Sequence, residues 1–169
     1  NAKIAGDIIG SELSSLGINT NLAPVVDVNN NPSNPVIGLR SYGDDAEMVG
    51  KMASAEIEGL AEYNVIGCAK HFPGHGDVAT DSHYGLPIVN KSKEELLNNE
   101  LKPYKVSINQ GIEMIMSAHI LYPQLDNTTV YSEKTKQQEK LPSTLSHKII
   151  TDLLKNELGD FSWESISMN

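Results

Sequence analysis

The segment Lys70–His83 holds a lysine, three histidines and two aspartates within 14 residues. Side chains of these types can transfer protons, donate charged hydrogen bonds or bind metal ions. An apolar run, Val65–Ala69, directly precedes the segment and is typical of a buried strand. Because loops that follow rigid strands commonly carry catalytic groups, the sequence predicts an active site here.

A hydrolytic metal site is one interpretation of this segment, because histidine and aspartate are both metal ligands. The candidate ligands are His71, His75, Asp77, Asp81 and His83. They contain no helical His-x-x-x-His pair, and their spacing matches no zinc pattern. We therefore expect no metal and no other cofactor.

Apolar patterns predict three strands, each followed by a loop and a helix. The predicted strands are Asn21–Val28, Val65–Ala69 and Met114–His119. The predicted helices are Ala2–Leu16, a helix capped by Asp44 or Asp45, one opened by the capping box Ser92–Glu95, and one that follows Pro142–Ser146. The polar segment Thr128–Lys140 shows no periodicity and is interpreted as a surface excursion.

Strands that alternate with helices at this spacing indicate βα units on a parallel sheet. Polar residues close each strand, namely Asp27, Lys70 with His71, and His119. The carboxyl ends of strands face the active site in a (β/α)8 barrel, and a doubly wound sheet remains an alternative. A complete barrel needs roughly 250 residues. We therefore expect an α/β fold, a partial (β/α)8 TIM barrel of three to four βα units that forms one domain over residues 1–169.

Composition narrows the classes of partner. The net charge of −9 argues against nucleic acid, whose phosphates need basic patches. No stretch approaches the ~18 consecutive apolar residues of a membrane span. The single cysteine, Cys68, lies in an apolar run and is expected to be a core residue. The compartment is left open.

Several ordered motifs resemble the β-N-acetylglucosaminidase branch of glycoside hydrolase family 3. They are Asn21–Val28, Asn34–Gly43, Lys70–Gly76, Asp81–His83, Met116–His119 and Pro142–Ser146. The resemblance implies a (β/α)8 barrel that hydrolyses β-linked N-acetylglucosamine with retention. Members of this branch act on peptidoglycan fragments or chitin oligosaccharides, so the expected partner is a saccharide that contains N-acetylglucosamine.

The resemblance also assigns roles to individual residues. It makes His83 the acid/base with Asp81 beside it, and it maps sugar-hydroxyl contacts onto Arg40, Lys70 and His71. A histidine suits proton transfer because an unperturbed imidazole titrates near pH ~6.5. Residues two apart lie on the same side of a segment when it is extended, so Asp81 is expected to fix the tautomer of the His83 imidazole and to stabilise its cation.

Structural interpretations stand beside these roles. Arg40 could be an ordinary surface or salt-bridged residue, and Asp27 and His119 could hold loops at the barrel mouth. His75 is expected to orient its neighbours and not to touch substrate.

Two parts of the family pattern are not found. The family's nucleophile is an aspartate in a strand that reads roughly Ser-Asp-(Ser/Ala)-Met, whereas Ser167-Met168 follows no aspartate here. The first barrel strands, with a substrate-binding aspartate, would precede residue 1. The expectation is an inactive fragment of an enzyme that associates with itself or with the rest of the barrel. The alternatives are a carbohydrate-binding module without turnover and a phosphorylase.

Overall fold

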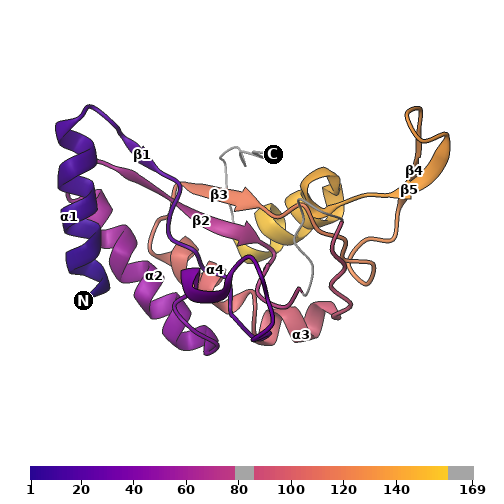
Figure 1. Ribbon diagram of the computed structural model, residues 1–169, viewed down its shortest axis with the longest axis horizontal. Coiled ribbons are helices and arrows are strands. Elements are labelled where there is room, and N and C mark those ends of the chain that lie inside the picture. Colours follow the sequence, from indigo (N-terminus) through magenta and orange to yellow (C-terminus); the bar gives the residue numbers. More distant parts are fainter. Residues whose placement is uncertain (79–85, 160–169) are drawn as a thin grey trace.

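A parallel three-stranded sheet forms the centre of the computed structural model, which describes residues 1–78 and 86–159. Its strands, in the order β1-β2-β3, are Thr20–Asn21, Ile66–Phe72 and Met114–Ser117. Figure 1 shows β2 and β3 running in the same direction, with α2 (Ala46–Ala61) and α4 (Lys102–Asn109) below the sheet. The α/β fold with parallel strands is therefore confirmed.

The first strand is much shorter than the predicted Asn21–Val28, because regular pairing stops at Asn21. The backbone nevertheless continues beside β2: the amide of Cys68 donates to the carbonyl of Ala23 (2.7 Å), and the amide of Val26 donates to the carbonyl of Lys70 (2.8 Å). Pro24 lies between these two contacts; it has no N–H group to donate, and its carbonyl accepts a hydrogen bond from the amide of Lys70 (3.2 Å). The prediction of a parallel first strand was right, and the predicted length of that strand was wrong.

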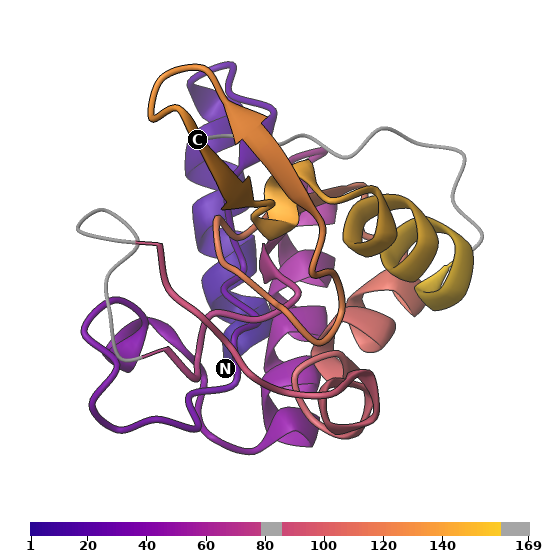
Figure 2. The ribbon, with the colours of Figure 1, turned by 90° about the vertical axis from the view of Figure 1, so that its right-hand side faces the viewer.

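The helix α1 (Ala2–Ser15) packs along α2 through small residues, and both views show the two helices side by side (Figure 2). A β-carbon on Gly59 would lie 2.4 Å from the carbonyl oxygen of Lys3, so only glycine permits this approach. The apolar stripe of α1 largely faces away, and Ile4 and Ile8 are 59% and 55% exposed.

The helix α2 begins and packs as its sequence predicts. The Asp45 carboxylate accepts a hydrogen bond from the amide of Met48 at 2.8 Å and caps the helix. Its apolar residues at helical spacing, Val49, Ala53, Ile57 and Leu60, are buried, while Met52 is partly buried. This face forms the core together with apolar residues of β2, α4 and the last helix.

The predicted third helix is two helices, α3 (Lys93–Asn98) and α4. The capping box is confirmed, since Ser92 and Glu95 exchange both hydrogen bonds. Pro103 lies in the first turn of α4, where its missing N–H group and its ring disfavour a continuous helix through Asn99. The break turns the side chain of Glu100 into the protein interior.

The polar segment after β3 contains regular structure that its sequence did not predict. β4 (Thr129–Ser132) and β5 (Gln137–Lys140) form an antiparallel hairpin that projects beyond the carboxyl ends of β2 and β3 (Figure 1). Its side chains are almost all exposed, which explains why no apolar periodicity marks it. Two short 3-10 turns, η1 (Gly38–Arg40) and η2 (Ser143–Leu145), and the π-helix η3 (Lys148–Leu158) complete the described elements.

A buried carboxylate joins the start of η3 to the loop that follows β3. Asp126 accepts hydrogen bonds from the hydroxyl of Ser146 (2.6 Å), from the hydroxyl (2.6 Å) and amide (3.0 Å) of Thr128, and from Lys148 (3.1 Å). Burial alone would raise the pKa of Asp126, but these donors more than offset it and hold the pKa below its ordinary value.

Replacement of Asp126 by asparagine should lower the free energy of unfolding by about 2 kcal/mol at pH 7, because charge-assisted hydrogen bonds are lost. A carboxyl group whose pKa is depressed by folding stabilises above its unfolded pKa of 3.8, and this contribution disappears as pH falls toward the folded pKa. The difference between Asp126→Asn and the native protein should therefore shrink at pH ~3 in urea unfolding. The exposed Asp152→Asn is the control, and an equal loss at both pH values would contradict this account.

Candidate active site

The buried carboxylate of Asp27 organises the carboxyl edge of the sheet. Its Oδ2 atom lies 2.7 Å from Nδ1 of His71, and its Oδ1 atom accepts hydrogen bonds from the backbone amides of His71 (3.2 Å) and His75 (2.6 Å). An ionised carboxylate only accepts hydrogen bonds, so Nδ1 of His71 carries a proton, and in the neutral imidazole Nε2 is then the acceptor. Asp27 thus sets both the position and the tautomer of the imidazole.

The loop after β2 follows a fixed path past Asp27. A β-carbon on Gly76 would lie 1.7 Å from the carbonyl oxygen of Val28, so glycine is required by this close approach. The side-chain amide of Asn34 donates to the carbonyl of His75 at 2.7 Å, and the hydroxyl of Tyr122 donates to the carbonyl of Gly74. Three segments of the chain therefore hold the loop in place.

Lys70 and His71 belong to β2, which extends three residues beyond the predicted Val65–Ala69. Lys70 is partly buried, and its burial and the positive charge of Arg40 both lower its pKa. Arg40, in η1, is exposed and donates to the carbonyl of Val36 at 3.2 Å. Within residues 1–78 and 86–159, no ion pair occupies either cation, so both can serve as donors to a ligand.

The segment that carries Arg40 is hydrogen-bonded to the backbone of Asp27. The hydroxyl of Ser41 donates to the backbone carbonyl of Asp27 at 2.6 Å. The structure therefore brings together Arg40, Lys70 and His71, which the sequence had placed on two separate motifs. Asp81 and His83 lie outside the described residues.

The structure also shows the surroundings of His119 and Cys68, which the sequence had singled out. His119 follows β3, is exposed, and has its Nδ1 atom 2.8 Å from the hydroxyl of Thr144. Cys68 is buried, as expected, and burial raises its pKa to about 11. A thiol that remains protonated at neutral pH is a poor nucleophile, so Cys68 acts as a core residue.

Sequence reasoning missed three polar residues close to the loop. They are Asn30, Lys91 and Glu100, and the first two both donate hydrogen bonds to the third. Lys91 and Glu100 occur in ordinary charged contexts along the chain, so only tertiary structure reveals them. Pro103 was the available signal, because it indicates the helix break that buries Glu100.

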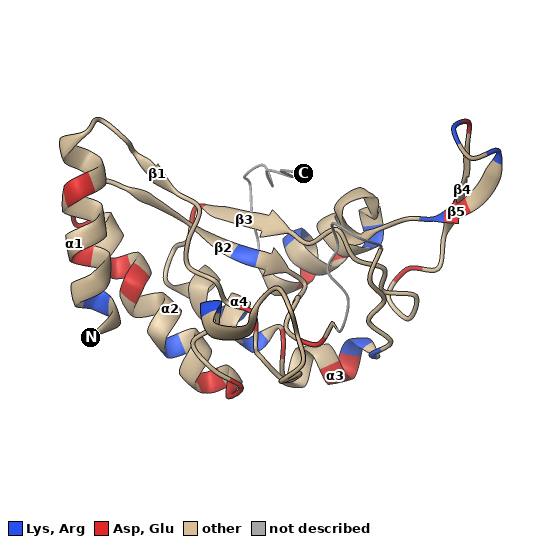
Figure 3. Cartoon of the chain, viewed as in Figure 1, with Lys and Arg blue, Asp and Glu red and all other residues tan. Residues whose placement is uncertain are grey.

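Metal ligation and membrane insertion find no support among the described residues. No group of three or more histidine, cysteine or acidic side chains in residues 1–78 and 86–159 could hold a metal ion. Over the same ranges, every helix is too short or too polar to cross a membrane. Figure 3 shows acidic and basic residues interspersed on α1, α2 and α3.

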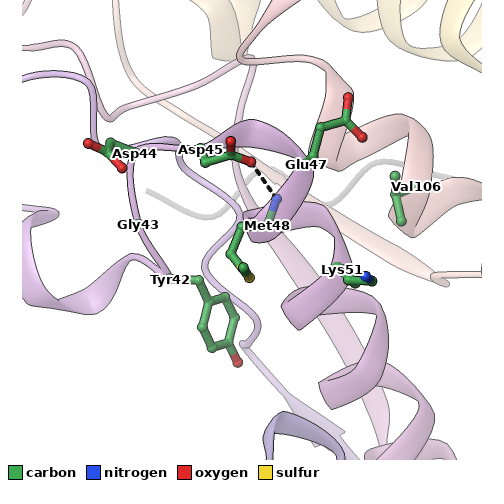
Figure 4. A pocket seen from close by; sticks show the side chains of 8 residues that line it. All are labelled: Tyr42, Gly43, Asp44, Asp45, Glu47, Met48, Lys51 and Val106. Atoms are coloured by element: carbon green, nitrogen blue, oxygen red, sulfur yellow. Dashed lines mark hydrogen bonds between the residues drawn. The ribbon is translucent and has the colours of Figure 1, made fainter.

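A surface pocket of about 650 Å³ lies between the start of α2 and α4, and its lining begins at Tyr42, next to Ser41 (Figure 4). Its charged lining consists of Asp44, Asp45, Glu47 and Lys51. Two of these acids have structural partners, since Asp45 caps α2 and Glu47 pairs with Lys102 at 3.1 Å. The pocket contains no histidine and none of the predicted site residues, so we assign it no catalytic role.

Replacement of Asp27 by asparagine should reverse the tautomer of His71, because an amide NH2 group can donate to Nδ1. The ring nitrogen chemical shifts of His71 should change, and the free energy of unfolding should fall by about 2 kcal/mol. Asp44→Asn, at an exposed acid, is the matched control. Unchanged ring shifts in Asp27→Asn would show that Asp27 does not set the tautomer.

Comparisons with known proteins agree on one protein family. Residues 1–163 match the family described as Glycosyl hydrolase family 3 N terminal domain. Beta-hexosaminidase A of Pseudoalteromonas piscicida is 45% identical over 152 residues, which are 89% of this chain and 25% of that protein. The chain therefore spans about a quarter of the length of this relative.

Two solved structures extend the comparison. A glycoside hydrolase family 3 β-N-acetylglucosaminidase from a Paenibacillus species has a TM-score of 0.89 and 43% identity, with coverage of 99% of this chain and 30% of that chain. The β-glucoside phosphorylase BglX has a TM-score of 0.87 and 29% identity, with coverage of 99% and 29%. The ordered motifs, the parallel βα units and these matches together show that the chain belongs to glycoside hydrolase family 3, and its residues 1–163 match the N-terminal domain of that family.

Proposed function

We propose that this chain is the part of a retaining β-N-acetylglucosaminidase that binds the sugar and transfers the proton. The substrate would carry a terminal β-linked N-acetylglucosamine, as in peptidoglycan fragments or chitooligosaccharides. The supporting observation is the site at the carboxyl edge of the parallel sheet, where His71 pairs with the buried Asp27 and the charge of Arg40 acts on the neighbouring Lys70. Two charged donors and one imidazole acceptor suit the hydroxyl groups of a sugar.

The order of proton transfers follows from the retaining mechanism. His83, held by Asp81, would protonate the leaving oxygen and later remove a proton from the attacking water. A carboxylate nucleophile is also needed to form the glycosyl-enzyme intermediate. We propose that the complete barrel supplies it, since no aspartate of this chain occurs in the family's Ser-Asp context.

The exposed apolar side of α1 supports the proposal that residues 1–169 form one partial-barrel domain. This domain would associate with the rest of the barrel or with a second copy of itself. Ile4, Ile8 and Leu16 are all more than half exposed. Exposed apolar surface of this kind favours association.

Sedimentation velocity should therefore detect species larger than a monomer, and Ile4→Lys/Ile8→Lys should reduce them. Leu145→Lys, at a similarly exposed apolar position on η2, is the control and should have little effect. A compact monomer at every concentration tested would contradict the proposal.

A chromogenic β-N-acetylglucosaminide tests the reaction directly. Protein that contains the complete barrel should release the chromophore, and His83→Ala should lower kcat by about a hundred- to ten-thousand-fold, the usual contribution of an acid/base group. His147→Ala, at the exposed histidine that precedes η3, should leave kcat unchanged.

Two outcomes would favour the other readings. Binding of N-acetylglucosamine without chromophore release by the complete barrel would make the chain a carbohydrate-binding module. Accumulation of sugar 1-phosphate when phosphate is added would identify a phosphorylase, a reading that the similarity to BglX favours.

A further inference from the structure

A second group of polar residues lies beside the site and has no role in the function proposed above. Its centre is Glu100, which is 2% exposed and occupies the break between α3 and α4. Lys91 donates a hydrogen bond to Oε1 of Glu100, and its ammonium nitrogen lies 3.2 Å from Oδ2 of Asp77. The side-chain amide of Asn30 donates to the same Glu100 oxygen at 2.6 Å. Four residues from four segments therefore meet in one network around this carboxylate.

The charges of this group support one another. Burial lowers the pKa of Lys91, but its hydrogen bonds with Glu100 and Asp77 and their charges raise it by more, so the net shift is upward. Lys91 consequently remains a cation throughout the pH range in which an imidazole titrates. The cation that joins Asp77 and Glu100 is therefore present wherever the proposed acid/base would work.

The triad brackets the segment that carries the proposed acid/base residues. Asp77 precedes Asp81 by four residues, and Lys91 follows His83 by eight. On the incoming side, the side-chain amide of Asn31 donates to the carbonyl of Asp77 at 3.4 Å.

The outgoing side is anchored separately. The amide of Val89 donates to the carbonyl of Leu121 (2.9 Å), and the amide of Leu121 donates to the carbonyl of Pro87 (2.9 Å). The contact between Asp77 and Lys91 joins the two sides directly, and Glu100 fixes the lysine that makes it.

Glu100 also packs against the loop itself. A β-carbon on Gly74 would meet the side-chain carbons of Glu100 at 3.0 and 3.1 Å. The carboxylate therefore has a defined position relative to the loop of His75 as well as to Lys91.

Stability alone does not require this arrangement. Buried ion pairs can commonly be replaced by apolar side chains of similar volume without loss of stability, because desolvation offsets their attraction. Charge-assisted hydrogen bonds differ from apolar contacts in their directionality, which fixes relative positions.

We propose that Glu100, acting through Lys91 and Asp77, is a positioning residue that holds both ends of the segment carrying Asp81 and His83. The proposal rests on the proposed acid/base role of His83. A misplacement of about 1 Å in a catalytic group can cost about a hundredfold in rate, so such a triad would affect turnover without touching the substrate.

The double variant Lys91→Met/Glu100→Gln tests this proposal in the complete barrel. It removes both charges of the closest pair together, and the introduced amide oxygen can still accept the hydrogen bond from Asn30. Asp77 loses its partner, but its side chain is 33% exposed and remains in contact with water. We expect kcat for the chromogenic substrate to fall about a hundredfold with KM nearly unchanged, and the pH profile of kcat to shift. The matched control is Lys93→Met/Glu157→Gln, which removes an ion pair of 2.5 Å between α3 and η3 and should leave kcat and its pH profile unchanged.

Hydrogen exchange gives a readout that does not require activity. The amides of Asn31, Val89 and Leu121, which donate hydrogen bonds to Gly76, Leu121 and Pro87 at the two sides, should exchange about tenfold faster in the double variant, while those of α1 keep their native rates. Unchanged exchange at these amides, or faster exchange with an unchanged kcat, would overturn the positioning role. Absence of turnover in the unsubstituted complete barrel would sink the proposed function instead, and the exchange rates would still decide whether the triad holds the two ends.

Discussion

The site depends on the hydrogen bonds that Asp27 accepts from the end of β2. A buried carboxylate without partners would carry a large desolvation penalty, so Asp27 is stable in its position only when the His71 ring and the loop amides surround it. Conversely, these groups need an acceptor because they are removed from water. The carboxylate and the loop therefore determine each other's geometry. Ser41 extends the same dependence to the segment that carries Arg40.

The same principle recurs at two other buried acids. Asp126 gathers donors from the start of η3 and from its own loop, and Glu100 gathers Lys91 and Asn30. All three acids lie in the connections between helices and strands. In these connections, apolar packing alone cannot specify the path of the backbone. The apolar core beneath, which includes the edge-to-face pair of Phe72 and Tyr104 at 5.1 Å, supports the sheet from which these loops extend.

Local signals in the sequence predicted local structure well. The capping box at Ser92 was predicted, and Asp45 was one of two predicted caps, because the residues that form these contacts are three positions apart and need no tertiary context. The short apolar runs likewise predicted β2 and β3, since buried parallel strands are apolar on both faces. The motifs also predicted the family, which the comparisons confirm.

Long-range features could not be predicted in this way. The contact between Asp27 and His71 spans 44 positions, and nothing local indicates which acid would be buried beside which imidazole. The apolar residues Ile4 and Ile8 of α1 are exposed, and its close approach to α2 instead uses the small surfaces of Gly6 and Gly10.

The central claim is that the residues assembled around Asp27 bind the sugar. The most direct measurement is a crystal structure of the protein with N-acetylglucosamine. The account predicts the sugar at the carboxyl edge of the sheet, with its hydroxyl groups within hydrogen-bond distance of Arg40, Lys70 and Nε2 of His71. Binding of the sugar in the acidic pocket at the start of α2, with these three side chains uncontacted, would contradict it.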